Sequence, residues 1–344
     1  MNQTGSLYRL DHVVHYYNDT KALNIDEMTI PAGSITGLTG PNGSGKSTLL
    51  KLLAFVSAPT SGNIYFKGRR EYPFSSRSRS RVTLLTQEPY LLKRSVYDNI
   101  AYGLKIRKDT KQLDDRVRNA LATVGLPYGE FAFRKWHQLS GGETQRAAMA
   151  ARLILEPEVL LLDEPTASVD ADSAKLIRDA SLKAREFFGT TLVIASHDWH
   201  WLYEICDNLL YLFKGMVFSS GMENIISGPW EKQGEDLYAR KIGGEGKLFV
   251  NTPPAEDSHA LVRKKDLHIN PHASGKEREN FDNRLEGVIT RMILEKAGME
   301  IITSVMIGDL FFTLRLSGQE VRSLRLYPGA KVVICFQKDA VQWL

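Results

Sequence analysis

The stretch Gly40–Thr48, GPNGSGKST, decides the fold of the N-terminal part of this chain. It matches the pattern G-x-x-x-x-G-K-[ST] and lies between an apolar run, SITGLTG (34–40), and a helical pattern, KSTLLKLLAFV (46–56). A glycine-rich loop in this position lets backbone N–H groups converge on phosphate oxygens, and the helix that follows points its positive end at the same anion. The stretch therefore predicts a nucleoside triphosphate site in an α/β domain.

The side chains of this loop have separate tasks. Lys46 adds positive charge near the β- and γ-phosphates, and the Ser47 hydroxyl can ligate Mg²⁺. Gly43 and Gly45 leave room for the anion because they have no Cβ. The whole stretch forms the candidate phosphate-binding set: Gly40, Pro41, Asn42, Gly43, Ser44, Gly45, Lys46, Ser47 and Thr48.

A second apolar run, EVLLLDEP (158–165), ends in two acidic residues. Such a continuous apolar run is typical of a buried parallel strand, as is TTLVIASH (190–197). An acidic residue at a strand end beside the phosphate loop can hold Mg²⁺ through water, which fits Asp163. Glu164 can polarise the attacking water as a general base. The alternative is a structural ion pair at the end of the strand.

A bare turn, LSGGETQR (139–146), precedes a third helical pattern. It has no metal-ligand spacing and no obvious nucleophile. Ser140 and Glu143 have the spacing of a capping box, which satisfies the free N–H groups at a helix start. The local pattern accounts for the start of a helix but not for the two adjacent glycines.

The order of these motifs resembles the nucleotide-binding subunit of an ABC transporter, a P-loop NTPase. The resemblance covers about residues 7 to 228 and rests on six motifs in sequence. They are GPNGSGKST, Gln87 in LLTQEP, LSGGETQR, LLLDEP, SVD (168–170) and ASH (195–197). The resemblance implies an α/β core with an N-terminal antiparallel β subdomain and a helical insertion at about 88–155.

The resemblance assigns a role to each matching position. Glu164, His197, Lys46 and Gln87 would be catalytic, and Ser47, Gln87 and Asp163 would hold Mg²⁺. Tyr17 would stack on the adenine, with Tyr16 as a competitor for that role. ATP would lie between the phosphate loop of one subunit and the turn LSGGETQR (139–146) of a second, which we call the signature turn. The resemblance implies that this turn would contribute Ser140, Gly141, Gly142 and Glu143, and that Asp170 in SVD would belong to the loop that couples the two sites.

The family's usual signature ends in Gln where this chain has Glu143. The presence of both Glu164 and His197 predicts two equivalent active sites in a homodimer that binds ATP and Mg²⁺. The implied partners are transmembrane permease subunits and a separate external substrate-binding protein, with no nucleic acid. The implied location is the cytoplasmic face of the cell membrane.

The last third of the chain changes character. Residues 231–284 are polar with scattered prolines, and we expect a connecting segment and linker there. Residues 285–344 have a glycine about every ten residues. The intervening stretches MEIITSVMI, LFFTLRL, QEVRSLRL and AKVVICF predict short strands of a small antiparallel β-barrel. Domain boundaries are therefore expected near residues 230 and 285.

This tail resembles the regulatory TOBE (OB-like) domain of bacterial and archaeal importer ATPases. Those importers carry sugars, polyamines, ferric iron or oxyanions, and the tail here is most similar to the molybdate and tungstate group. In oxyanion-binding tails the entry usually reads Ser-x-Arg-Asn-x-Leu-x-Gly, and Asn283, Leu285 and Gly287 fit the Asn, Leu and Gly positions of that pattern. Asn280 and Asp282 occupy its Ser and Arg positions, and a carboxylate at Asp282 is unfavourable for an anion.

Composition limits the remaining classes. The chain has 43% hydrophobic residues and a net charge of +4, too small to indicate nucleic-acid binding by itself. Its two cysteines, Cys206 and Cys335, are far apart in sequence and form no C-x-x-C pair, which favours free thiols in a reducing compartment. No apolar run suggests a signal peptide or a membrane span. Two alternatives stay open, a soluble ABC-type ATPase acting on DNA or ribosomes and a sensor that holds ATP without turnover.

Overall fold

The structure, a computed structural model, divides into two compact units, Met1–Ser219 and Ser220–Leu344. It describes residues 6–218, 223–243, 246–271, 281–294 and 300–344. Among these residues, no helix combines the length and the apolar composition needed to cross a membrane. Each unit has its own hydrophobic core.

The N-terminal unit contains two sheets. An antiparallel sheet has the order β2 (Thr20–Pro31), β1 (Ser6–Tyr17), β4 (Ser61–Phe66) and β5 (Arg69–Arg70). The second sheet has the order β10 (Met216–Phe218), β9 (Asn208–Phe213), β3 (Ile35–Thr39), β8 (Thr191–Ala195), β7 (Val159–Asp163) and β6 (Val82–Leu85). From β9 to β6 these strands are parallel, and β3, β7 and β8 are buried throughout.

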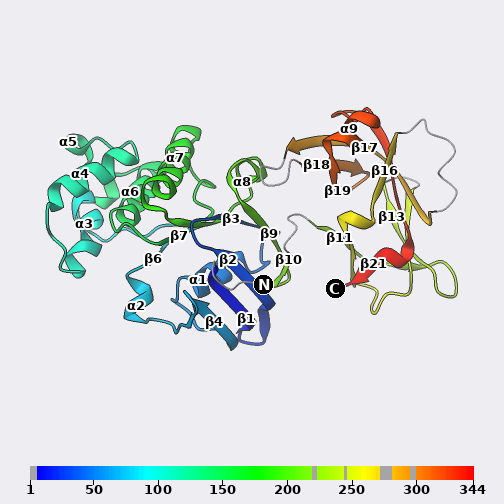
Figure 1. The fold of residues 1–344 in the computed structure, drawn as a ribbon, viewed down its shortest axis with the longest axis horizontal. Helices are drawn as coiled ribbons and strands as arrows, with labels where there is room; N and C mark the ends of the chain where they lie inside the picture. Colours follow the sequence, from blue (N-terminus) through cyan, green and yellow to red (C-terminus); the bar gives the residue numbers. More distant parts are fainter. Residues whose placement is uncertain (1–5, 219–222, 244–245, 272–280, 295–299) are drawn as a thin grey trace. The chain divides into compact units, whose positions relative to one another are not determined.

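Helix α1 (Lys46–Leu53) shares one hydrophobic core with both sheets of this unit. Its leucines belong to the same core cluster as the buried side chains of β1, β2, β7 and β8. The remaining helical elements of the unit are α2 (Ser76–Arg79), α3 (Val96–Ile106), α4 (Leu113–Thr123), α5 (Tyr128–Phe131), η1 (Trp136–Gln138), α6 (Gly141–Leu153), α7 (Ala171–Phe188) and α8 (Trp199–Ile205). Helices α3 to α6 gather at one end of the parallel sheet (Figure 1). The expected α/β core with a helical insertion is confirmed.

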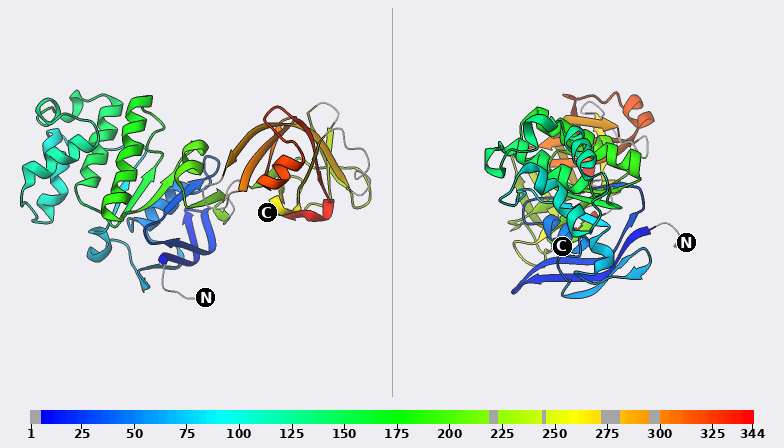
Figure 2. Two further views of the ribbon diagram at one scale, coloured as in Figure 1. Left: turned by 45° about the horizontal axis from the view of Figure 1, so that its top comes forward. Right: turned by 90° about the vertical axis from the view of Figure 1, so that its left-hand side faces the viewer.

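The C-terminal unit is built from antiparallel strands that curl, as Figure 2 shows. One sheet runs β16 (His268–Pro271), β20 (Lys331–Phe336), β17 (Asn283–Leu294), β18 (Glu300–Ile307) and β19 (Leu310–Ser317). A second runs β11 (Asn224–Ser227), β15 (His259–Val262) and β21 (Val341–Trp343), and a third β12 (Glu231–Lys232), β13 (Tyr238–Ile242) and β14 (Gly246–Val250). The short helices are α9 (Gly318–Ser323), η2 (Lys264–Asp266) and η3 (Lys338–Ala340). This arrangement is consistent with the expected small barrel-like domain.

Two expectations for the tail are wrong. The described part of residues 231–284 is not a linker, because β12 to β16 lie within it and Leu248 and Ile269 are buried in the core of the unit. These strands are short, and β15 and β16 pair with strands distant in sequence, β15 with β11 and β21 and β16 with β20. By contrast, β12, β13 and β14 pair with one another in chain order. The stretch QEVRSLRL begins in helix α9 rather than a strand, because Ser317 and Glu320 form a capping box at its start.

Candidate functional site

The carboxyl ends of the parallel strands bring the predicted motifs together. The phosphate loop follows β3, the acidic pair ends β7, and His197 follows β8 by two residues. Gln87 follows β6 by two residues. Because β3, β8, β7 and β6 are neighbours in the sheet, their carboxyl ends meet at one edge, where ligands of open α/β sheets bind.

A cavity of about 680 Å³ lies at this edge. Its lining is Tyr17, Thr20, Lys21, Ala22, Asn42, Gly43, Ser44, Gly45, Lys46, Ser47, Thr48, Gln87, Asp163, Glu164, Ala167 and His197. Four lining residues belong neither to the motifs nor to the other predicted site positions: Thr20, Lys21, Ala22 and Ala167. The first three lie three to five residues after Tyr17, at the start of β2, so proximity in sequence to the expected stacking residue is a usable signal.

The phosphate loop is shaped by close backbone contacts. Gly45 has φ of 107°, and a Cβ there would lie 2.7 Å from the Ala22 carbonyl oxygen. The Lys46 ammonium is buried, with 7% of the residue exposed, and donates to the carbonyls of Gly40 at 2.8 Å and Pro41 at 3.1 Å. Burial lowers the pKa of Lys46, and the nearby charge of Glu164 acts in the opposite direction. The loop therefore holds a cation at the floor of the cavity.

The acidic pair is also buried. Burial raises the pKa of Asp163 and of Glu164 above their usual values. The Oδ1 atom of Asp163 has no hydrogen-bond partner among the described residues, and the Ser47 hydroxyl bonds to the same carboxylate. These oxygen donors fit Mg²⁺, which prefers carboxylate and hydroxyl oxygens. Glu164 has φ of 45°, a conformation that costs a non-glycine residue about 1 kcal/mol or more.

His197 contacts two of the other predicted residues. Its Nε2 lies 3.1 Å from Oε1 of Glu164 and 3.1 Å from Oδ1 of Asn42. Its backbone N–H donates to Oε2 of Glu164 at 3.2 Å. Both interactions lower the pKa of Glu164 and so oppose the effect of burial. His197 therefore connects the phosphate loop to the acidic pair.

The two tyrosines at the end of β1 differ in position. Tyr17 lines the cavity and is half exposed. Tyr16 is not among the lining residues, and the ammonium of Lys21 lies 5.7 Å from the centre of its ring. Of the two, Tyr17 is in position to contact a nucleotide base in this cavity.

The signature turn starts α6 and does not line this cavity. The Ser140 hydroxyl accepts from the Glu143 N–H at 3.3 Å, and Glu143 Oε2 accepts from the Ser140 N–H at 2.8 Å, which completes the capping box. A Cβ on Gly141 would meet no atom within 4 Å, whereas one on Gly142 would lie 2.8 Å from Asp170 Oδ2. The N-terminal end of α6 thus presents an open backbone surface at Gly141.

Asp170 is the N-cap of α7. Its carboxylate accepts from the backbone N–H of Ser173 at 2.8 Å and from the Ser173 hydroxyl at 2.8 Å, and these bonds hold the pKa of Asp170 below its usual value. The same carboxylate lies beside Gly142. A second cavity, of about 310 Å³, is lined by Gly141 together with Gln87 and Glu164, so it joins the signature side to the acidic pair.

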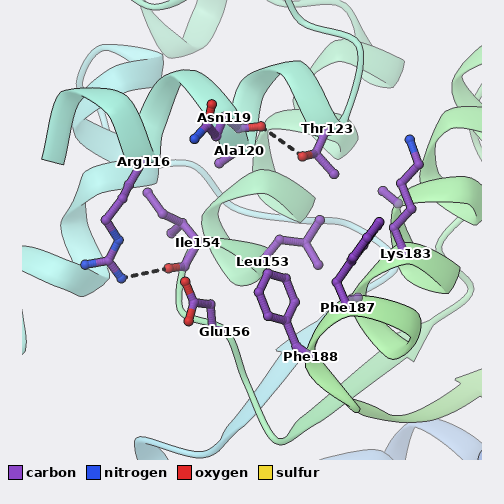
Figure 3. Close-up of a pocket in the computed structure, with 12 residues that line it drawn as sticks. Arg116, Asn119, Ala120, Thr123, Leu153, Ile154, Glu156, Lys183, Phe187 and Phe188 are labelled. Atoms are coloured by element: carbon purple, nitrogen blue, oxygen red, sulfur yellow. Dashed lines mark hydrogen bonds between the residues drawn. The ribbon is translucent and has the colours of Figure 1, made fainter. Parts of the chain in front are cut away.

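A smaller cavity of about 250 Å³ lies between α4, the end of α6 and α7 (Figure 3). Phe187 and Phe188 lie beside Leu153 there, and both phenylalanines are exposed. This cavity contains none of the residues that the motifs single out. It is separate from the candidate site.

Comparisons with known proteins agree with this geometry. A family described as ABC transporter matches residues 23–167. A tungstate uptake system ATP-binding protein of Peptoclostridium acidaminophilum is 36% identical over 202 residues, which are 58% of this chain and 92% of that protein. A sulfate/thiosulfate import ATP-binding protein of Mycobacterium bovis is 37% identical over 92% of this chain and 88% of that protein.

A solved structure gives the same result for the N-terminal unit. It is a dimeric ATP-binding cassette in a post-hydrolysis state with ADP and phosphate bound, 27% identical, with a TM-score of 0.57 over 61% of this chain and 96% of that one. The chain therefore belongs to the ABC transporter ATP-binding proteins of import systems, in which ATP hydrolysis is coupled to transport.

Proposed function

We propose that this chain is the ATP-hydrolysing subunit of an importer for a tetrahedral oxyanion such as tungstate, molybdate or sulfate. The observation that carries the ATP-hydrolysing role is the convergence of Lys46, Ser47, Asp163 and Glu164 on one cavity at the carboxyl edge of the parallel sheet. The proposed cargo follows the tungstate and the sulfate/thiosulfate import relatives. In this arrangement a cation, a metal-binding pair and a general base face the same space. Phosphoryl transfer needs these groups, because it depends mainly on positioning and on stabilising charge.

The phosphate loop would bind the triphosphate. Backbone N–H groups of the stretch 40–48 and the N-terminal end of α1 would hold the phosphate oxygens. Lys46 would exchange the carbonyls of Gly40 and Pro41 for phosphate oxygens. Ser47, Asp163 and Gln87 would hold Mg²⁺, which neutralises charge on the β- and γ-phosphates when it is bound. Tyr17 would stack on the base at the outer end of the cavity.

Glu164 would act on the attacking water. It must be ionised to accept a proton, and burial works against ionisation. The contacts from His197, through the ring and the backbone N–H, favour the ionised form. His197 would also meet the γ-phosphate, because Asn42 of the phosphate loop lies within 3.1 Å of its ring.

A second copy of the chain would complete each site. The signature turn is open at Gly141 and does not line the cavity of its own phosphate loop. Ser140, Gly141, Gly142 and Glu143 would face the γ-phosphate bound to the other copy, with the positive end of α6 behind them. Asp170, which abuts Gly142, would couple the two sites.

Transport would require permease subunits at the membrane. Tyr90 is 93% exposed, and Leu92, Tyr102 and Ile106 are also exposed on the helical part of the unit. We place the permease contact on this surface and the chain at the cytoplasmic face, with a separate external substrate-binding protein selecting the cargo. An apolar helix of the permease would bury these side chains.

The C-terminal unit would regulate transport without holding the cargo at the predicted positions. The Asp282 carboxylate accepts from the Lys338 N–H at 3.0 Å, and Asn283 bonds to both backbone groups of Phe249 at 2.7 and 2.9 Å. Both side chains therefore already have hydrogen-bond partners within the unit. Asn280, which occupies the Ser position of that pattern, lies outside the described residues.

The first test is dimer formation. A Glu164→Gln chain should bind ATP and Mg²⁺ without turnover and elute as a dimer on size-exclusion chromatography, whereas wild type should turn ATP over and stay monomeric. Glu186→Gln, on the exposed side of α7, is the matched control and should behave as wild type. A Glu164→Gln chain that keeps full ATPase activity would exclude Glu164 as the base. An inactive wild type that holds ATP would favour the sensor alternative.

The cargo is tested separately. The chain should co-purify with membrane subunits when the genes next to its own are co-expressed with it, whereas a soluble ABC-type ATPase would not co-purify with them. Transport of radiolabelled tungstate, molybdate and sulfate into vesicles holding that complex should single out one oxyanion. A thermal-shift titration of the chain alone with the same anions and Mg²⁺-ATP should give no selective rise, because Asp282 and Asn283 are occupied.

A further inference from the structure

His15 is a buried histidine whose ring nitrogens have no hydrogen-bond partner in the part of the chain that the structure describes. The residue is 8% exposed, and neither Nδ1 nor Nε2 has a hydrogen-bond partner among the described residues. A buried polar group without a partner carries a free-energy cost that an apolar side chain would not. The use of an imidazole on β1 is therefore not explained by hydrogen bonding in the fold.

The contact that His15 does make is with Tyr17. The two ring centres are 4.7 Å apart and the ring planes are nearly perpendicular, at 86°. This is a favoured arrangement for aromatic pairs, and it resists rotation of either ring. The register of β1 against β2 shifts between His15 and Tyr16, and the ring contact shows that His15 and Tyr17 share one side of the strand.

We propose that His15 is a positioning residue that fixes the ring plane of Tyr17 for stacking on the base of the bound nucleotide. The inference rests on the proposed stacking role of Tyr17, which lines the cavity while His15 does not. Its consequence is selective. Loss of the His15 ring weakens binding of a nucleotide with a base and leaves the binding of a bare polyphosphate unchanged.

The experiment compares Mg²⁺-ATP with Mg²⁺-tripolyphosphate, both titrated calorimetrically into the full chain. His15→Leu fills the buried space without a ring and should weaken ATP about two- to tenfold, with tripolyphosphate unchanged. His15→Phe restores a ring and should bind ATP within about twofold of wild type. His12→Ala is the matched control, because His12 lies on the same strand with its side chain exposed.

Two outcomes overturn the inference while leaving the proposed function in place. One is an equal loss of ATP and tripolyphosphate affinity in His15→Leu, which would indicate a general structural role. The other is unchanged ATP affinity in His15→Leu while Tyr17→Ala weakens it. If Tyr17→Ala itself leaves ATP binding unchanged, the stacking role of Tyr17 fails and the inference fails with it. In a Tyr17→Ala background, His15→Leu should have no further effect on ATP affinity.

Discussion

Gly141→Ala should leave the fold intact and abolish most of the ATPase activity. Gly141 is the first residue of α6 and exposed, and an added Cβ would meet no atom within 4 Å in the chain itself. Alanine is preferred over glycine in helices by up to about 1 kcal/mol. We therefore expect the melting temperature of the nucleotide-free chain to stay unchanged or to rise by about 2–4 °C.

The loss of activity follows from what the open surface faces in the proposed dimer. The added methyl group would stand between the end of α6 and the γ-phosphate bound to the second copy. A displacement of about 1 Å at a reacting phosphate costs about a hundredfold in rate. Phosphate release at saturating Mg²⁺-ATP should fall by that factor, and Glu164→Gln/Gly141→Ala should no longer form the ATP-bound dimer.

Gly129→Ala is the matched control. Gly129 lies in α5, and a Cβ there also meets no atom within 4 Å. It should share the unchanged melting temperature and keep wild-type activity. A Gly141→Ala chain with ATPase activity within about threefold of wild type would refute the reasoning that this surface meets phosphate. A melting temperature lowered by several degrees would refute the claim that the space is open.

Three further predictions concern other parts of the chain. His197→Ala should move the acidic limb of the pH profile of kcat/KM to higher pH. Burial raises the pKa of Glu164 and His197 opposes that rise, so the pKa of Glu164 should increase when His197 is removed. An acidic limb at the wild-type pH would contradict this. Trp230→Ala should destabilise the C-terminal unit by about 3–5 kcal/mol, because the indole is buried and donates to the Ser258 carbonyl at 2.7 Å. Scanning calorimetry should show one unfolding transition at a lower temperature, and the chain should still bind ATP. Gly45→Ala should lower the melting temperature and weaken ATP binding together, and a chain with wild-type stability would show that Ala22 can move aside.

Much of the candidate site could be predicted because its chemistry is local. The phosphate loop is one continuous backbone segment, and the acidic pair and His197 each follow an apolar run that is recognisable as a buried strand. The capping box of Ser140 and Glu143 also depends only on neighbours in sequence. Patterns of this kind survive in a sequence because three to nine adjacent residues suffice to make them.

In the C-terminal unit, local sequence patterns do not suffice to predict the helices and strands. Ser317 and Glu320 start a helix within a stretch whose spacing resembles a strand, because the capping box decides the local conformation. The strands β15 and β16 are four residues each, and they pair with strands distant in sequence, β15 with β11 and β21 and β16 with β20. Their pairing is stabilised by a shared core that no window of the sequence contains.

The sequence by itself determined the family, the phosphate loop and the residues that end each strand, because these depend on contiguous segments. Only the tertiary structure decided how those residues meet. It placed the His197 ring 3.1 Å from both Asn42 and Glu164, and it set Tyr17 rather than Tyr16 against the cavity with His15 beside it. It also kept the signature turn off the cavity of its own phosphate loop. The physical reason is that strand order and packing bring distant residues together, and a linear pattern carries no record of that order.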